Sequence, residues 1–367
     1  GDMEVEIAMP QVEEGTTATD FVANTTGSPL WIASPTFGPR VPMILVEPSA
    51  ENLVPYSEDF SNSAWSKSNT TVTSNESTSP DGLNNASLVT VNSASISHLR
   101  DFFPISAAAH TFSIYAKAGT TTNIQLYVIE QGVGSGTADV DIQSGVVTNV
   151  SSEWNGGVTT ENIGNGWFRI RGTRTFTTSA SNHGIGVAAT GQNGLNFYIW
   201  GAQLETGSVV TSYIPTSGST VTRAADDLVI SGSDFDFYNQ TEGTFYCEFQ
   251  TKDATAFYYL LNSQSEQARF FYSNGGTNTI NSFDGTTALG LTNLQDNTLS
   301  RVALSIKASE FKASKDGSSE AVEPHNGNLL TVPTELRIGK SPYNGVPLQL
   351  NGHIKRLIYW PTHSDNL

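Results

Sequence analysis

The sequence predicts an all-β protein built from tandem antiparallel β-sandwiches of the jelly-roll type, with almost no helix. Charged residues make up only 14% of the 367 residues, and 33 glycines accompany many Ser, Thr and Asn. This composition is typical of short strands joined by polar turns. Apolar and polar residues also alternate along many short segments, as they do in half-buried strands. The length exceeds that of a usual single domain, so we expect two or three domains.

The beginning of the chain repeats a later segment. Residues 8–15 (AMPQVEEG) parallel residues 200–207 (WGAQLETG), and both are followed by similarly spaced Thr, aromatic and Gly residues. We therefore expect residues 1–28 to hold the terminal strand of a preceding module, in a chain cut from a longer polypeptide, or a strand that docks on a neighbouring module. Residues 29–50 are rich in proline, which lacks a backbone donor and favours extended chain, so they are predicted to be a linker.

Strand patterns fill the rest of the chain in two groups. In the first module, predicted at residues 51–222, alternation marks 110–119, 122–131, 166–176 and 194–205. In the second, predicted at residues 223–367, it marks 244–252, 256–262, 268–275, 301–309, 311–317, 336–341 and 353–360. Asp-Gly turns at 284–285 and 316–317 favour antiparallel hairpins, and hence sandwiches, over a parallel α/β sheet.

Charge and cysteine content exclude several classes of function. Lys and Arg total 18 against 35 Asp and Glu, a net charge of −17, so phosphate backbones are repelled and nucleic-acid binding is not expected. A single cysteine, Cys247, excludes a disulfide within the chain and a zinc site made of thiolates. No apolar run approaches the roughly 20 residues that span a bilayer, so membrane insertion is not expected.

Five motifs, in order, carry a resemblance to a known group of proteins. They are residues 40–66, 164–176, 197–230, 238–249, and 336–341 together with 350–365. The chain resembles modules of bacteriophage tail-fibre, tailspike and head-fibre proteins. Within this likeness, residues 51–222 resemble a jelly-roll carbohydrate-binding module, and residues 223–367 are similar to laminin-G or concanavalin-like lectin sandwiches.

The resemblance implies a structural and adhesive part of a phage virion appendage, made in the bacterial cytoplasm. Its implied partners are host surface polysaccharide and other virion proteins, and its implied assembly is a homotrimer. Two alternatives stay open. One is a purely architectural spacer or fibre protein that binds no ligand, and the other is a capsular polysaccharide depolymerase.

The residues themselves argue against an enzyme. Glycoside hydrolysis needs two carboxylates about 5 to 10 Å apart, one of them with a raised pKa. Acidic pairs occur at Glu58/Asp59, Asp139/Asp141, Asp226/Asp227 and Asp234/Asp236. Nothing in the sequence desolvates one member of a pair, no Gly-x-Ser-x-Gly motif occurs, and the histidines are scattered. We therefore name no catalytic residue.

Glycan binding needs an exposed aromatic face with a few polar partners. Trp154 lies among polar and Gly residues, where burial is hard to arrange, so it is the first candidate for glycan contact. The other candidates are Tyr127, Trp65, Tyr272 and Tyr343. Trp167, Trp200 and Trp360 lie within alternating strand motifs and are predicted to pack in the core.

Calcium is the one metal that the resemblance implies, because related jelly rolls carry a structural ion bound by loop oxygens. The implied ligands are Glu58, Asp59, Gln203 and Glu205. The repeat at Gln11 and Glu13 favours a different role for the last two. In that alternative they are buried polar residues that close one end of a sandwich by hydrogen-bonding to the backbone.

Overall fold

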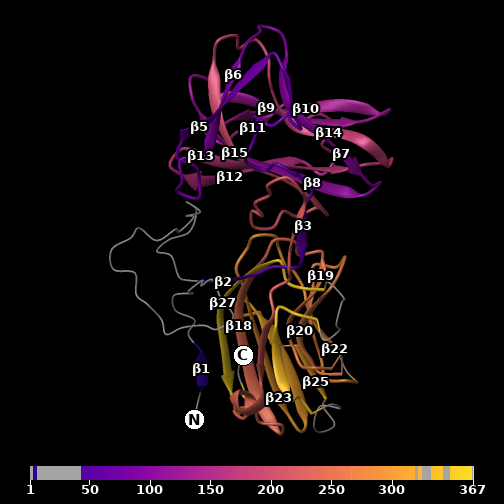
Figure 1. The fold of residues 1–367 in the computed structure, drawn as a ribbon. Coiled ribbons are helices and arrows are strands. Elements are labelled where there is room, and N and C mark those ends of the chain that lie inside the picture. Colours follow the sequence, from indigo (N-terminus) through magenta and orange to yellow (C-terminus); the bar gives the residue numbers. More distant parts are fainter. Residues whose placement is uncertain are drawn as a thin grey trace. The chain divides into compact units, whose positions relative to one another are not determined.

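The computed structural model describes residues 3–5, 43–265, 267–286, 288–318, 321–324, 332–341, 348–365 and 367 (Figure 1). In these residues every regular element is a strand, apart from one turn of 3-10 helix at Gly232–Phe235. All neighbouring strands pair antiparallel, and the sheets stack as sandwiches. The predicted all-β fold of antiparallel sandwiches is thus confirmed. No helix in the described part of the chain is long and apolar enough to cross a membrane.

The described residues divide into two compact units. Residues 50–223 form one, called here the N-terminal unit, and residues 3–5, 43–49 and those from 224 onward form the other, the C-terminal unit. The sequence predicts modules at 51–222 and 223–367. Residues 43–49 fall in the predicted linker, yet β2 (Ile44–Val46) pairs with β27 (Gly352–Trp360) and places Val46 in the core of the C-terminal unit.

The N-terminal segment contributes one described strand. β1 (Met3–Val5) pairs antiparallel with residues 357–359 of β27. The repeat at residues 8–15, and with it Gln11 and Glu13, lies outside the described residues.

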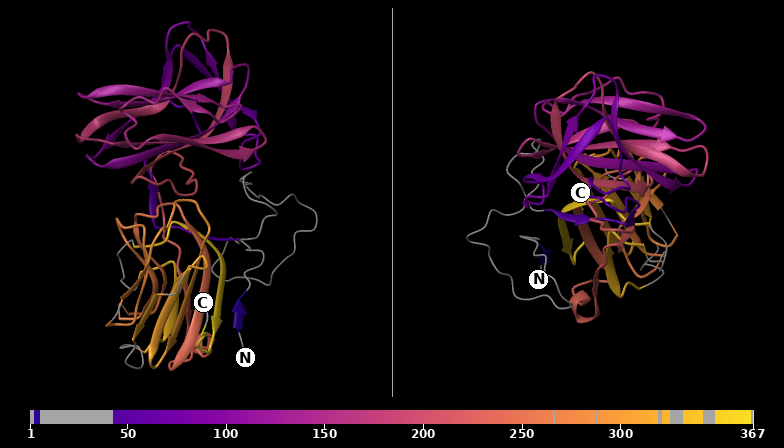
Figure 2. Two further views of the ribbon diagram at one scale, coloured as in Figure 1. Left: turned by 180° about the vertical axis from the view of Figure 1, so that it is seen from behind. Right: turned by 45° about the horizontal axis from the view of Figure 1, so that its top comes forward.

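The N-terminal unit is a sandwich of two six-stranded sheets (Figure 2). The first sheet runs β11 (Val147–Thr148), β10 (Gly134–Asp141), β9 (Asn123–Glu130), β14 (Ala180–Ala189), β7 (Ser97–Ile105), β4 (Ser66–Ser68). The second runs β12 (Val158–Gly164), β13 (Trp167–Thr175), β8 (Ala109–Ala118), β15 (Asn196–Thr206), β6 (Ala86–Val91), β5 (Thr70–Ser77). A small ladder joins β3 (Ala50–Asn52) to β16 (Val221–Arg223), so the two ends of the unit lie together. Alternate residues of both sheets, such as Leu126 and Ile170, form the core between them.

A buried ion pair joins these two sheets at one end. Glu130 ends β9 in the first sheet, and Arg174 lies near the end of β13 in the second. The Arg174 guanidinium donates to Glu130 Oε2, while Glu130 Oε1 accepts from the Thr177 hydroxyl (2.6 Å) and from the backbone N–H groups of Thr177 (2.7 Å) and Thr178 (2.9 Å). Burial alone would raise the pKa of Glu130, but these hydrogen bonds outweigh it and lower the pKa to about 2.

The C-terminal unit is a second sandwich with an aromatic core. One sheet runs β1, β27, β18 (Glu242–Thr251), β23 (Ser300–Lys307), β24 (Glu310–Lys315), β25 (Ala321–Pro324), with β2 also paired to β27. The other runs β17 (Leu228–Ser231), β26 (Glu335–Ile338), β19 (Phe257–Asn262), β20 (Arg269–Asn274), β21 (Ile280–Phe283), β22 (Ala288–Leu291). Phe245 of β18 and Phe270 of β20 meet between the sheets, with ring centroids 4.4 Å apart. Since one face of β18 is used for this core, its alternate residues project from the outer face.

Candidate functional site

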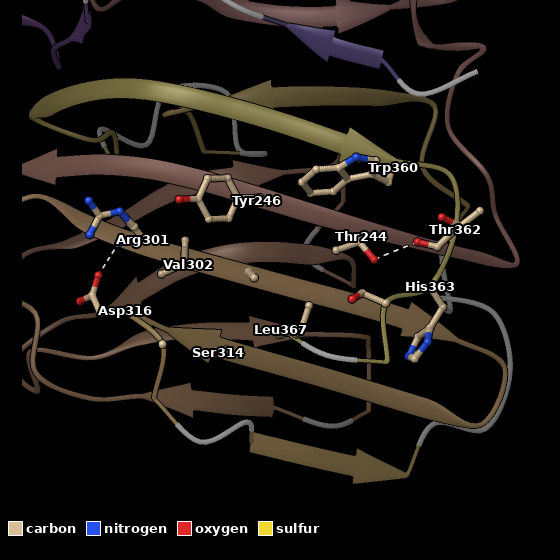
Figure 3. A pocket seen from close by; sticks show the side chains of 13 residues that line it. Thr244, Tyr246, Arg301, Val302, Ser314, Asp316, Trp360, Thr362, His363 and Leu367 are labelled. Atoms are coloured by element: carbon tan, nitrogen blue, oxygen red, sulfur yellow. Dashed lines mark hydrogen bonds between the residues drawn. The ribbon is translucent and has the colours of Figure 1, made fainter. Parts of the chain in front are cut away.

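A groove of about 470 Å³ lies on the outer face of the C-terminal unit, over β27, β18, β23 and β24 (Figure 3). Strand alternation determines which residues line it. Phe245, Cys247 and Phe249 are buried in the core, so Thr244 and Tyr246 project to the opposite side of β18. The groove is therefore formed by the sheet face itself and by the segment that follows β27.

Two aromatic side chains lie on this face. Trp360 pairs with Thr244 across β27 and β18, which places it diagonally beside Tyr246, and Figure 3 shows both rings above the sheet. Both are partly exposed. Across from Tyr246 on β23 stands Ala303, whose small side chain leaves the floor between the strands open. The groove thus offers ring surface beside a shallow apolar floor.

Hydrogen bonds of hydroxyl and backbone groups hold the segment that follows β27, which forms one wall of the groove, against the sheet. Thr244 Oγ1 donates to the carbonyl oxygen of Thr362 (2.9 Å), and the backbone N–H of Ser364 donates to Ser305 Oγ (2.9 Å). His363 lies in the same segment, with Nε2 at 3.3 Å from Glu310 Oε1. Burial lowers the pKa of His363 from its ordinary value. The segment that follows β27 is therefore tied down over the sheet.

Glu248 holds the Tyr246 ring in place. The Tyr246 hydroxyl donates to Glu248 Oε1 (2.8 Å), and Lys355, at the bulge where β27 shifts register against β18, donates to Oε2 (2.7 Å). Burial would raise the pKa of Glu248, but the bonds from Lys355 and Tyr246 lower it overall. Burial and the bond to Glu248 raise the pKa of Tyr246 to about 12. At neutral pH the phenol is therefore a fixed donor, and its ring is held in one orientation.

The described residues that line the groove include one acidic side chain, Asp316. Its Oδ1 accepts the backbone N–H of Arg301 (2.8 Å), and its Oδ2 accepts from Lys315 Nζ (2.5 Å). Ring surface, a small floor and a polar rim are features that bind a ligand with both apolar and hydroxylated faces.

The two tryptophans expected to contact glycan lie in the core instead. Trp65 is 1% exposed, packs 4.9 Å from Phe60 between ring centroids, and donates from Nε1 to the carbonyl oxygen of Tyr56. Trp154 is 3% exposed because Gly172 on β13 has no side chain: a Cβ there would lie 2.8 Å from the indole carbons. Both rings face the interior, which corrects the expectation that they contact glycan; for Trp154 that expectation came from its polar neighbours in the sequence.

The expected tyrosines lie on other sheet faces. Tyr127 of β9 is 7% exposed and lies 4.6 Å from His98 between ring centroids, and the Arg100 guanidinium lies 5.9 Å from its ring. Tyr272 of β20 is also 7% exposed, with the Arg269 guanidinium 5.0 Å from its ring. Little ring surface is open at either residue, and Tyr343 lies outside the described residues.

Trp360 is the aromatic residue that sequence reasoning placed wrongly in the core. It follows Tyr359, and successive residues of a strand point to opposite faces. With two adjacent aromatic residues, the sequence does not show which one faces inward. The structure buries Tyr359 against Phe245 (4.7 Å between centroids), so Trp360 turns outward to the groove. Tyr246 lies between Phe245 and Cys247, so strand alternation places its side chain on the face opposite to theirs. The sequence does not show which of these two faces is the inner one.

The four residues expected to bind calcium do not converge on one point. Gln203 and Glu205 are buried and joined to each other, with Nε2 to Oε2 at 2.7 Å. Gln203 Oε1 also accepts the backbone N–H of Ile214, and Glu205 accepts that of Thr211. Burial and hydrogen bonds to the backbone agree with the alternative role of these two residues.

Glu58 and Asp59 are also occupied within the protein. Glu58 accepts from the Tyr213 hydroxyl (3.0 Å) and from Asn85 Nδ2 (3.2 Å), whereas Asp59 is exposed and accepts from Ser61. Burial, with a smaller effect of Asp81, raises the pKa of Glu58 despite its bond to Tyr213. In the described part of the chain, no group of three His, Cys, Asp or Glu side chains is arranged to hold a metal ion. The predicted ligand set therefore does not fit calcium.

Comparison with known proteins finds solved structures that are similar to this chain but does not assign the chain to a family. No family model and no curated protein matches the chain. Among solved structures, domains LG4-5 of the mouse laminin α1 chain are 11% identical, with 71% of this chain and 85% of that chain covered and a TM-score of 0.26. The tandem CBM22 domains of Paenibacillus barcinonensis Xyn10C are 8% identical, with 87% and 99% covered and a TM-score of 0.30.

A sialidase from Trypanosoma rangeli is 10% identical, with a TM-score of 0.28. The match covers 81% of this chain and spans about half of the sialidase, at 51%. Because all three TM-scores are low, these similarities assign neither a family nor a ligand to this chain.

Proposed function

We propose that this protein is a lectin-like carbohydrate-binding protein that holds a surface glycan in the groove of its C-terminal unit. The observation that supports this most is the pair of outward-facing rings, Tyr246 and Trp360, over the Ala303 floor. Saccharides present C–H groups that pack on aromatic faces and hydroxyls that need fixed polar partners. The groove supplies both on one open sheet face.

Rigidity favours binding at such a shallow site. Tyr246 is held by Glu248, and Glu248 by Lys355. A side chain that is already ordered loses less conformational entropy when the ligand arrives, and about 0.5–1.5 kcal/mol is saved for each ordered side chain. Binding without hydrolysis is supported by Asp316, the acidic side chain of the described lining, because its oxygens already accept from Arg301 and Lys315.

We further propose that the protein is a structural and adhesive part of a bacteriophage appendage, such as a tail fibre or head fibre, that binds host surface polysaccharide. The five ordered sequence motifs and the helix-poor sandwich architecture support this role. A shallow groove binds weakly, so a homotrimer that joins other virion proteins would gain affinity by presenting several grooves to one polymer. In this proposal the protein is made in the bacterial cytoplasm and acts on the virion.

A glycan array with the full chain, followed by calorimetry on the strongest ligand, tests the proposed function. We expect Trp360→Ala and Tyr246→Ala each to weaken binding at least about tenfold, which corresponds to about 1.4 kcal/mol. Phe102→Ala is the matched control, because Phe102 is an aromatic residue that is 39% exposed in the other unit. Unchanged affinity in both groove variants would refute the site. A folded protein that binds no saccharide would refute the function and favour the architectural spacer.

A further inference from the structure

We propose that the groove selects acidic saccharides, with the guanidinium of Arg301 pairing with a sugar carboxylate; this rests on the proposed carbohydrate-binding function. Arg301 lies on β23 at one end of the groove, beside Tyr246 (Figure 3). Its side chain is 53% exposed. The guanidinium is therefore accessible to a ligand on the same sheet face as the rings.

Glu248 and Asp316 are the acidic side chains beside Arg301, and both lie closer to other hydrogen-bond donors than to the Arg301 guanidinium. Arg301 pairs with Glu248 across β23 and β18, yet its Nε is 4.0 Å from Glu248 Oε1. The two oxygens of Glu248 accept from Tyr246 at 2.8 Å and Lys355 at 2.7 Å. Asp316 bonds to the backbone N–H of Arg301 and to Lys315, as described above. The guanidinium fork, whose geometry matches a carboxylate, is thus left to face the groove.

The charge around the groove differs from that of the whole chain. The protein has a net charge of −17, a field that repels anions from most of its surface. The strands of this sheet carry six basic side chains (Arg301, Lys307, Lys312, Lys315, Lys355 and Arg356) and five acidic ones (Glu4, Glu242, Glu248, Glu310 and Glu323), so their charges nearly balance. An anionic ligand therefore meets less repulsion here than the net charge suggests.

The strand register connects the two parts of the site. Ala303 lies directly across from Tyr246, and Arg301 is two residues before Ala303 on the same outer face. A sugar whose carboxylate pairs with Arg301 then has its ring over the Ala303 floor and against Tyr246. A hexuronic acid or another carboxylated sugar satisfies both contacts, whereas a neutral sugar makes only the ring contact.

The test compares polygalacturonate, alginate and hyaluronan oligomers with their carboxyl-reduced neutral forms, measured by calorimetry on the full chain. We expect at least one acidic oligomer to bind about tenfold more tightly than its reduced form, with the difference shrinking as salt increases. Arg301→Gln should abolish that difference, and Arg301→Lys should retain part of it. Lys340→Gln is the control, since Lys340 pairs with Asp227 at the other sheet and carries the same charge.

Three outcomes would overturn the inference: no acidic oligomer binds, the reduced forms bind equally well, or Arg301→Gln keeps the preference while circular dichroism shows a native fold. These outcomes are distinct from failure of the proposed function. If neutral glycans bind through Tyr246 and Trp360, carbohydrate binding holds and only the acidic specificity fails. If no saccharide of any charge binds, both fail.

Discussion

The Glu130–Arg174 pair makes a quantitative prediction about acid stability. Glu130 has an ordinary pKa of 4.5, which the folded protein lowers to about 2. A carboxylate with a lowered pKa stabilises the fold above its unfolded pKa, and the stabilisation disappears as the pH falls through the folded value. Each pKa unit is worth about 1.4 kcal/mol, so the ionised group contributes about 3 kcal/mol at pH 7. At about pH 3, roughly 2 kcal/mol of this is lost.

Glu130→Gln removes this pH-dependent contribution and leaves a buried Arg174 without its anion. We expect it to lower the free energy of unfolding by about 3–5 kcal/mol near pH 7. Near pH 3 this loss should be smaller by about 2 kcal/mol. Urea unfolding at both pH values, followed by tryptophan fluorescence, measures the change. Glu76→Gln is the control, because Glu76 is exposed on β5 of the same unit. A difference between wild type and Glu130→Gln that stays constant between the two pH values would refute the reasoning.

Three further predictions concern single side chains. Trp154→Ala should lower the free energy of unfolding by about 3–5 kcal/mol, seen in urea melts, and leave glycan affinity unchanged, because the ring is buried in the core. Burial raises the pKa of Asp101 to about 6, so Asp101→Asn should raise the urea midpoint at pH 8, with the gain disappearing below about pH 4. Tyr246→Phe keeps the ring but loses the bond to Glu248, so calorimetry should show a smaller loss of glycan affinity than Tyr246→Ala.

Sequence patterns predicted the strands better than the exposure of individual side chains. Alternation at residues 110–119, 122–131 and 194–205 predicted strands that the structure places at β8, β9 and β15. The same reasoning misplaced Trp154, since polar neighbours indicate a loop but not what lies beneath it. Gly172, eighteen residues later and on strand β13, leaves the space that the indole fills. Such long-range complementarity has no local signal.

The sequence by itself determined the all-β class, the acidic charge and the absence of a disulfide within the chain. These follow from composition and from a two-residue period, which are local properties. Only the tertiary structure decided that Trp360 faces outward, that Gln203 and Glu205 bond to backbone, and that Arg301 lies beside Tyr246. Strand register brings these residues together, and register depends on pairing between distant segments that no local pattern specifies.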